Sequence, residues 1–432
     1  MGKNRALALL LLLLGGAATC AGDSFEDLLA NLKSPTARTR EDAARQLGES
    51  RRREAVAPLS ALVRDGEPRV RLEMVRALAA LRDVSGIPAL LTALEDGDPR
   101  VRDEAISAIV EIYAERSRSG PVGRFLGLFS DEAPRSSVPP FTVVDPSVFR
   151  GLSRALTDED ASIRTDAAYA IGILGGGSSI PDLVRALADP SADVRAAAAA
   201  AIGKAGTPAD GRALVPLLAD TSTSVRNRAL QAIGVLRVPE AAPALRELFE
   251  QNRRRELGTR ALAALARTGD PAQADHLRAL LSSHDPELRR LAVEGLARVS
   301  PPSARPEFEV GFQREGNADV RMAYAFGIAR LGGRSFLDTL VLPLGGGGRR
   351  AERANDLLLE LGPGIARDLY PYLNDPDAGV RGAVAELLAA LGDKEAVPRL
   401  QPLIADPDSR VADRANRAIR RLSRDGAGTS TP

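Results

Sequence analysis

The stretch DPSADVRAAAAAAIGKAG, residues 189–206, contains the pattern that decides the fold of this chain. An aspartate-proline pair opens it, an apolar residue followed by arginine stands at Val194-Arg195, and a run of alanine leads to Gly203. Aspartate can cap the first free N–H groups of a helix, proline fits a first helical turn, and alanine has the highest helix propensity. The stretch is therefore predicted to form a capped helix that stops near a glycine.

The apolar-arginine pair, called the anchor below, recurs along the chain, mostly at steps of 31 or 32 residues. Its clear copies are Val70-Arg71, Val101-Arg102, Ile163-Arg164, Val194-Arg195, Val225-Arg226, Leu288-Arg289, Val320-Arg321 and Val380-Arg381. Thr39-Arg40 opens the series, and Leu257-Gly258, Arg350-Ala351 and Val411-Ala412 are degenerate copies, which makes twelve units. A fixed period of about 20 to 50 residues indicates a solenoid.

Each unit is predicted to contain two helices, such as those over residues 166–175 and 180–187. Several second helices have proline near their start, where its missing N–H costs nothing, at Pro58, Pro88, Pro181, Pro243 and Pro398. Pro216, Pro371 and Pro402 fall later, and kinks or early helix ends are expected there. With 44% hydrophobic but only 3% aromatic residues, the core consists of small aliphatic side chains. The predicted fold class is all-α, an α-α superhelix of about twelve helical hairpins.

The pattern of residues 189–206 resembles HEAT repeats, in particular the short class found in phycobilisome lyases. The resemblance covers roughly residues 23 to 423, apart from an insertion at 117–145. In HEAT arrays the turn aspartate and the anchor arginine typically join neighbouring units by hydrogen bonds. The resemblance therefore implies a structural ladder that pairs Asp98 with Arg102, Asp189 with Arg195, Asp220 with Arg226, Asp285 with Arg289, and Asp375 with Arg381. These motif residues are structural and imply a fold, not an activity.

The ends of the chain differ from the repeats. Residues 1–22 have a positive start, an apolar core of nine residues and small residues before the end, which is typical of a secretion signal. We expect repeats 1–3 over 23–116, repeats 4–12 over 146–423, a disordered tail over 424–432, and export to the periplasm or cell envelope of a bacterium. Cys20, the only cysteine, stands where a lipoprotein would be modified. Ordinary cleavage nearby is the preferred interpretation, and membrane attachment is expected only if Cys20 is lipidated.

The insertion at 117–145 is rich in Pro, Gly and Ser and is the best candidate site in the sequence. Its apolar side chains are Phe125, Leu128, Phe129 and Phe141. They could fill the gap between the flanking repeats, which is the favoured interpretation. The alternative is a partner-binding loop, because insertions project from one face of a solenoid and aromatic side chains anchor interfaces.

The sequence contains no recognisable catalytic centre. Deoxyhypusine hydroxylase, a HEAT-repeat enzyme, binds iron through His-Glu pairs, whereas His276 and His284 are followed here by Leu277 and Asp285. The four glycines at 345–348 lack the Lys-Ser/Thr of a phosphate loop and are interpreted as a hinge. We therefore predict no catalytic residues, no cofactor and no metal site.

The function expected from the sequence is a non-enzymatic scaffold that binds protein partners with its concave face and, in one interpretation, with the 117–145 loop. A net charge of +1 and the export signal argue against nucleic acid as a partner. The alternative is a HEAT-type enzyme, either phycobilin lyase-like or a degenerate deoxyhypusine hydroxylase-like oxidoreductase. A lyase would act on cytoplasmic phycobiliproteins, which conflicts with export.

Overall fold

The computed structural model describes residues 24–113 and 143–424, and all regular structure in these ranges is helical. The contacts divide the chain into two units. Unit 1 holds the described residues up to Asp210 together with Thr221–Arg228, and unit 2 holds Gly211–Asp220 and the described residues from Ala229 on. Within the two described ranges, no helix has the length and apolar composition required to span a bilayer.

Several sequence-based predictions lie outside the described residues. They are the secretion signal with Cys20, the tail after residue 424, and the four apolar side chains of the insertion, Phe125, Leu128, Phe129 and Phe141. These remain predictions.

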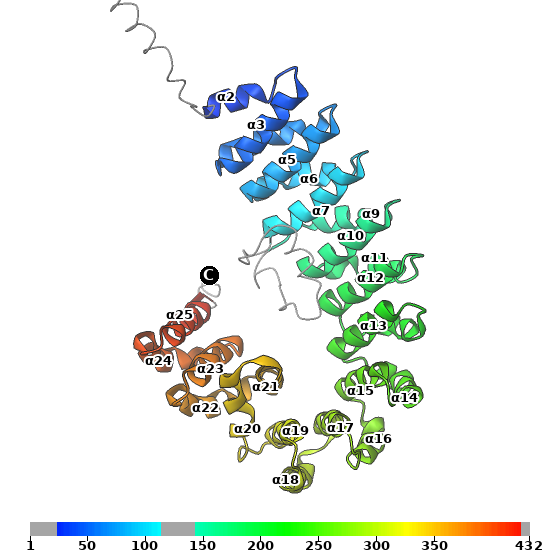
Figure 1. Cartoon of the computed structure of the whole chain (residues 1–432), viewed down its shortest axis with the longest axis vertical. Helices are drawn as coiled ribbons and strands as arrows, with labels where there is room; N and C mark the ends of the chain where they lie inside the picture. Colours follow the sequence, from blue (N-terminus) through cyan, green and yellow to red (C-terminus); the bar gives the residue numbers. More distant parts are fainter. Residues whose placement is uncertain (1–23, 114–142, 425–432) are drawn as a thin grey trace, which may run out of the picture. The chain divides into compact units, whose positions relative to one another are not determined.

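Unit 1 consists of two rows of helices (Figure 1). Neighbouring long helices pack side by side in one row: α3 (Ala37–Glu49), α5 (Pro68–Leu81), α7 (Pro99–Tyr113), α10 (Ala161–Leu174) and α12 (Ala192–Ala205). The other row holds the short helices α2 (Phe25–Asn31), α4 (Val56–Ser60), α6 (Ile87–Ala93), α9 (Pro146–Ala155) and α11 (Ile180–Ala186). The long helix α13 (Thr223–Leu236) begins in unit 1 and ends in unit 2.

Unit 2 repeats this arrangement. Its long helices are α15 (Glu256–Thr268), α17 (Pro286–Val299), α19 (Ala318–Arg330), α21 (Gly348–Leu361), α23 (Ala378–Ala390) and α25 (Ser409–Arg424). Its short helices are α14 (Ala242–Gln251), α16 (Ala274–Leu280), α18 (Arg305–Arg314), α20 (Asp338–Val341), α22 (Ala366–Leu369) and α24 (Val397–Leu400). Short 3₁₀ segments complete the second row, among them η5 (Asp210–Ala219), η9 (Leu342–Gly346), η11 (Tyr370–Asn374) and η13 (Gln401–Ala405).

Each short element and the long helix that follows it form one hairpin, from α2 with α3 to α24 with α25. The described residues contain twelve such hairpins, so the predicted all-α solenoid of about twelve hairpins is confirmed. Among the described residues, α9 and α10 form the one complete hairpin between α7 and the hairpin of α11 with α12.

Proline positions set where the short helices begin and how they end. Pro88, Pro181, Pro243 and Pro398 each stand in the first turn of a short helix, as predicted. Pro216, Pro371 and Pro402 lie inside 3₁₀ segments, where 3₁₀ hydrogen bonds replace those of an α-helix. Proline has no N–H to donate to the carbonyl four residues earlier, so an α-helix cannot continue unchanged through it. The predicted early ends are therefore observed.

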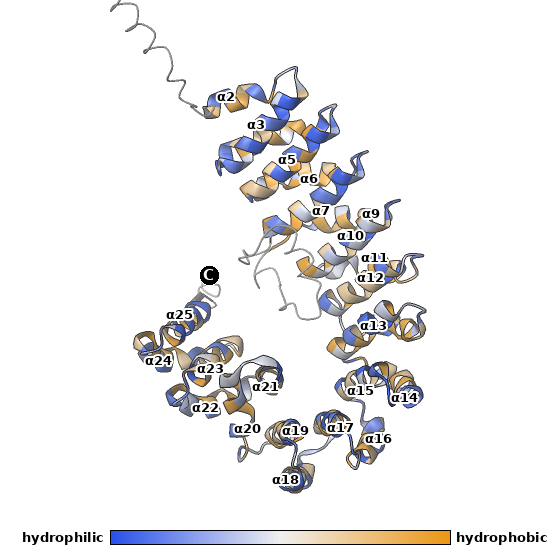
Figure 2. Cartoon of the chain, in the orientation of Figure 1, coloured by the Kyte–Doolittle hydropathy of each residue, from blue (hydrophilic) through white to orange (hydrophobic). Residues whose placement is uncertain are grey.

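Small residues allow the long helices to pack closely. An added Cβ on Gly172 of α10 would lie 2.8 Å from the Cα of Ala201 on α12, so no larger residue fits between these helices without movement. The buried residues around this contact are Ala, Ile, Leu and Val, as composition predicted. Figure 2 shows that hydrophilic residues gather at the turns of unit 1, away from these helix contacts.

Candidate interaction surface

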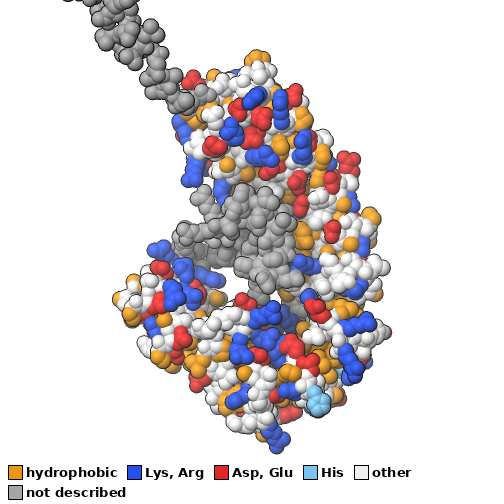
Figure 3. All heavy atoms as spheres, viewed as in Figure 1, with side chains coloured by type: hydrophobic (Ala, Val, Ile, Leu, Met, Phe, Trp, Pro, Cys, Tyr) orange, Lys and Arg blue, Asp and Glu red, His pale blue; other side chains and the backbone are white. Residues whose placement is uncertain are grey.

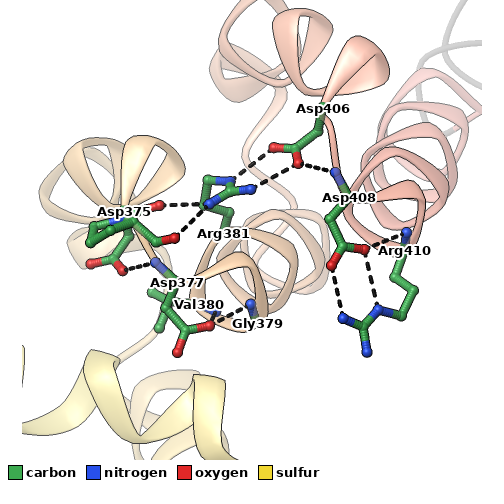
Figure 4. A network of polar contacts seen from close by, with 9 residues as sticks. Asp375, Asp377, Gly379, Val380, Arg381, Asp406, Asp408 and Arg410 are labelled. Atoms are coloured by element: carbon green, nitrogen blue, oxygen red, sulfur yellow. Dashed lines mark hydrogen bonds and ion pairs between the residues drawn. The ribbon is translucent and has the colours of Figure 1, made fainter.

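Anchor arginines join successive repeats through paired hydrogen bonds. Arg381 donates from Nε and Nη2 to the two carboxylate oxygens of Asp406, both at 2.8 Å, and from Nη1 to the main-chain oxygen of Asp375 at 2.8 Å (Figure 4). Asp406 also accepts the N–H of Asp408 at 2.9 Å. The hydrogen bond from Arg381 is the largest cause that holds the pKa of Asp406 below its ordinary value. One arginine thus ties the turn before its own helix to the turn of the next repeat.

This arrangement recurs in both units, and it corrects the predicted pairing. The observed pairs are Arg40–Asp65, Arg71–Asp96, Arg102–Asp158, Arg164–Asp189, Arg289–Glu315 and Arg381–Asp406. Each carboxylate comes from the following repeat, whereas the prediction took it from the same turn as the arginine. The prediction was wrong for Arg102 and Arg289, whose carboxylate partners are Asp158 and Glu315, because an arginine side chain is long enough to span the groove between two repeats.

The predicted aspartates have other roles. Asp98 and Asp285 accept main-chain N–H groups at the starts of α7 and α17. Asp189 accepts from Arg164, and both Asp189 and Asp375 offer main-chain oxygens to the arginines predicted to pair with them, Arg195 and Arg381.

The remaining anchor arginines vary. Arg226 donates to the main-chain oxygen of Thr221 at 3.1 Å. The guanidinium of Arg321 lies 4.5 Å from the centre of the Phe312 ring, where a cation–π contact replaces a carboxylate. Arg226 and Arg321 thus make contacts within their own repeat.

The exposed face of the long helices is a second feature that repeats. Counted from the anchor arginine position, the second, fifth and ninth residues lie on one side of each helix, because a helix turns once every 3.6 residues. In unit 1 charged residues on this side neutralise each other. Arg45 bonds Asp42 at 2.8 Å on α3, and Arg76 on α5 bonds Glu104 on α7 at 3.1 Å.

In unit 2 the ninth position is arginine in three consecutive long helices. Arg267, Arg298 and Arg330 stand nine residues after positions 258, 289 and 321. The same position in the next helix, α21, is Glu360. Three successive long helices of unit 2 therefore have arginine at this position, and the fourth has a carboxylate.

Glu360 joins two arginines from different repeats. Arg298 bonds its carboxylate through Nε at 2.9 Å and Nη2 at 2.8 Å, and the Arg298 side chain is only 4% exposed. Arg237, just after α13, approaches Glu360 at 3.0 Å and is 50% exposed. We call Arg237, Arg298 and Glu360 the Glu360 clasp. Helices four repeats apart in a straight stack would be on the order of 40 Å apart. The clasp therefore shows that α21 lies much closer to the end of α13 than a straight stack would place it.

The position of α21 follows from the glycine segment predicted to be a hinge. Gly347 and Gly348 have φ angles of +67° and +69°, a left-handed conformation that favours glycine. They turn the chain so that η9, not α21, packs closely on α23. Arg350 at the start of α21 bonds Asp319 of α19 at 2.9 Å. The glycines and these ion pairs together direct α21 towards α15 and α17.

Electrostatics distinguish the paired from the unpaired groups on this surface. Burial alone would raise the pKa of Glu360, but the hydrogen bond from Arg298 and the charges of Arg298, Arg237 and Arg330 lower it below its ordinary value. Arg267 and Arg330 keep exposed surface, yet partial burial is the largest cause that lowers the pKa of both guanidinium groups. Basic side chains gather beside acidic ones between α15 and α21 on the face seen in Figure 3.

A carboxyl pair on the exposed face of unit 1 predicts a pH effect. Burial, then the hydrogen bond and charge of Asp103, raises the pKa of Asp166 to about 7. Because the folded protein holds this proton more tightly than the unfolded chain, its contribution to stability is complete below pH about 4 and is lost as the pH rises through about 7. We expect the melting temperature of the wild type to fall between pH 5 and pH 8. The variant Asp166→Asn should show a smaller fall, and identical pH profiles would contradict this.

The two histidines do not form a site with other ligands. His276 packs edge-on against Phe249 and lies 3.8 Å from Glu250. Burial lowers the pKa of His276. Over residues 24–113 and 143–424, no group of three or more His, Cys, Asp or Glu side chains is placed to hold a metal ion.

Sequence reasoning missed the Glu360 clasp and the arginines beside it. The available signal was the register, because arginine at the ninth position occurs in three successive units and Glu360 in the fourth. The glycines at 345–348 predict a hinge but not the direction in which α21 turns there, and without that turn the charges of the clasp would be far apart.

Stacked helical hairpins, joined by arginine-carboxylate pairs, define an α-helical repeat protein. The chain belongs to the HEAT-repeat family, because the model of HEAT repeats matches residues 25–118, 149–234, 211–297 and 363–427, more than half of the sequence. No curated protein matches the chain.

Three solved structures illustrate what the chain is similar to. An engineered protein is 21% identical over 93% of this chain and 99% of its own, with a TM-score of 0.39. The complex of CpcE and CpcF of phycocyanin lyase from a Nostoc species is 19% identical over 73% of this chain and 97% of its own, with a TM-score of 0.30. Kap95p, whose binding induces the switch loops of RanGDP to adopt the GTP-bound conformation, is 13% identical over 99% of this chain and 64% of its own, with a TM-score of 0.47. None of these values assigns a function.

Proposed function

We propose that this chain is a non-enzymatic scaffold of the bacterial periplasm or cell envelope that binds a protein partner with the exposed face of its long helices. The observation that carries the proposal is the separation of roles along each long helix. Buried positions and anchor residues hold the repeats together, while exposed side chains of the long helices, such as Arg45 on α3 and Arg260 on α15, lie outside these contacts. Within each unit, stacked repeats thereby present an extended surface, the type that solenoid proteins use for binding.

Photo-crosslinking from defined positions tests this surface. A crosslinking residue is placed at Arg45 and Arg260, which are exposed on long helices, and, as matched controls, at Val184 and Val310, which are exposed on short helices. We expect one discrete protein to be crosslinked in cells from the first two positions and not from the controls. Crosslinks from the short helices alone would overturn the proposal.

Location and activity are tested separately. The full chain should be found in the envelope fraction, and deletion of residues 1–22 should retain it in the cytoplasm. Purified protein should neither transfer a bilin to phycocyanin apoprotein nor contain stoichiometric iron with turnover. Either activity would replace the scaffold with the enzymatic alternative.

A further inference from the structure

Helix α21 has fewer buried residues than the long helices around it in unit 2. It buries Ala354, Leu357 and Leu358, whereas α17 and α19 each bury eight residues and α23 buries seven. Burial of apolar side chains is the main force that holds a helix against its neighbours. Hydrophobic packing therefore holds α21 less firmly than α17, α19 and α23.

Glycines in the left-handed conformation stand at both ends of α21. Gly347 and Gly348 at its start have φ angles of +67° and +69°, and Gly362 just after its end has a φ angle of +75°. A Cβ added to any of the three would meet no other atom within 4 Å, so neighbouring side chains do not enclose them. Because glycine has access to more backbone conformations than other residues, the chain can change direction at both ends of α21.

The segments beyond these glycines have apolar contacts of their own. Before α21, Leu340 and Val341 of α20 are fully buried, and η9 packs on α23. After α21, Ile365 and Leu369 are buried. A movement of α21 alone would leave all these contacts in place.

Ion pairs supply the attachment that apolar packing does not. Near the start of α21, Arg350 bonds Asp319 of α19 at 2.9 Å, but these side chains are 53% and 39% exposed, so water competes for the pair. Near the end of α21, Glu360 bonds Arg298 of α17, and these side chains are only 12% and 4% exposed. The buried pair of the Glu360 clasp is therefore the stronger attachment.

We infer that α21 is a movable helix, which turns at the glycines on either side of it and is held against α17 and the end of α13 by the Glu360 clasp. Without the carboxylate of Glu360, Arg237 and Arg298 would repel each other, and both already act on Arg330. Glu294, 3.8 Å from Arg298, would be the nearest carboxylate left to it. This movement requires no partner and goes beyond the proposed binding function.

Release of α21 is expected to be local. A helix of 14 residues that has lost its neighbours is marginally stable in water, so α21 should fray in the released state. Its main-chain amides would then exchange with solvent. The amides of α19 and α23 would stay protected, because the buried residues of these helices remain packed.

Hydrogen exchange of the wild-type full chain tests whether α21 opens by itself. We expect the amides of α21 to exchange at least about tenfold faster than those of α19 and α23. Equal protection of the three helices would overturn the inference, because α21 would then open only when unit 2 unfolds as a whole.

Distances between pairs of spin labels test the role of the clasp. Cys20 is the only cysteine, so a Cys20→Ser background allows labels on new cysteines at the exposed positions Glu352 of α21 and Val235 of α13. The variant Glu360→Gln removes the charge with little change in size. It should add label distances that are longer by about 5 Å or more, half the spacing of packed helices. A second label pair, at Val235 and Arg260 of α15, does not involve α21 and should keep its distance.

Glu395→Gln is the matched control for the loss of charge. Glu395 bonds Arg367 at 2.9 Å elsewhere in unit 2, and both side chains are exposed. The substitution therefore breaks an ion pair without altering the contacts of α21. We expect the distance between the labels on α21 and α13 to equal that of the wild type.

Four further results would overturn the inference. The first two are unchanged distances in Glu360→Gln and the same longer distances in Glu395→Gln. The third is an equal change in the label pair on α13 and α15. The fourth is a loss of helical circular dichroism in Glu360→Gln larger than α21 can account for, because α21 would then be unable to leave its position without unfolding its neighbours.

Discussion

Replacing Glu360 by alanine should destabilise unit 2 by about 3 kcal/mol, because it leaves the guanidinium of Arg298 buried without its carboxylate. Glu294 lies 3.8 Å from Arg298 and replaces only part of the lost interaction. Urea unfolding followed by circular dichroism measures the loss of stability. Hydrogen exchange should locate it in α17 and α21 and leave α3, α5 and α7 unchanged.

The two arginines of the clasp supply an internal comparison. Arg237→Ala removes a partner that is half exposed, and such pairs contribute below about 1 kcal/mol. A loss for Arg237→Ala as large as that for Glu360→Ala would contradict the assignment of the buried pair as the stabilising one.

Acid should reproduce part of the Glu360→Ala effect in the wild type. The pKa of Glu360 is lower in the folded protein than in the unfolded chain, so its stabilisation is complete above pH about 4.3 and is lost as the pH falls through the depressed pKa. Glu360→Gln should lack this component. If acid lowers the free energy of unfolding of the wild type and of Glu360→Gln by the same amount, the loss of stability does not come from the clasp.

The second large effect is expected from replacing Arg102 by alanine. This change should lower the free energy of unfolding of unit 1 by about 3 kcal/mol. Arg102 bonds both oxygens of Asp158 at 2.8 and 2.9 Å and the main-chain oxygen of Asp96 at 2.8 Å, and its side chain is 8% exposed. It joins α7 to the turn before α10, across the point where residues 114–142 interrupt the regular spacing.

An open cavity of about 400 Å³, lined by both charged and apolar residues, lies beside this pair and limits the predicted loss. Water in the cavity can hydrate Asp158 once Arg102 is gone, which keeps the cost at the lower end for a broken buried pair. Arg100→Ala is the matched control, because Arg100 is on the same helix, bonds Asp98 and is 72% exposed. Thermal unfolding should show a change of only a few degrees for the control. Equal effects of the two variants would contradict the role of Arg102.

The sequence by itself determined the repeat and its local structure. Regular spacing of anchors, first-turn prolines such as Pro88, and helix-breaking prolines such as Pro371 predicted the hairpins, because each acts through the backbone of neighbouring residues. The alanine-rich core also followed, since close helix packing such as that at Gly172 requires small side chains.

Only the tertiary structure decided which charges meet. Arg102 bonds Asp158 and not Asp98, and Arg298 bonds Glu360 from two repeats further on, because long side chains reach across grooves whose width depends on how repeats stack. Two left-handed glycines, Gly347 and Gly348, rotate α21 out of its row and bring Glu360 to its partners. Ion pairing between distant residues depends on such rotations, and residue spacing along the chain does not encode them.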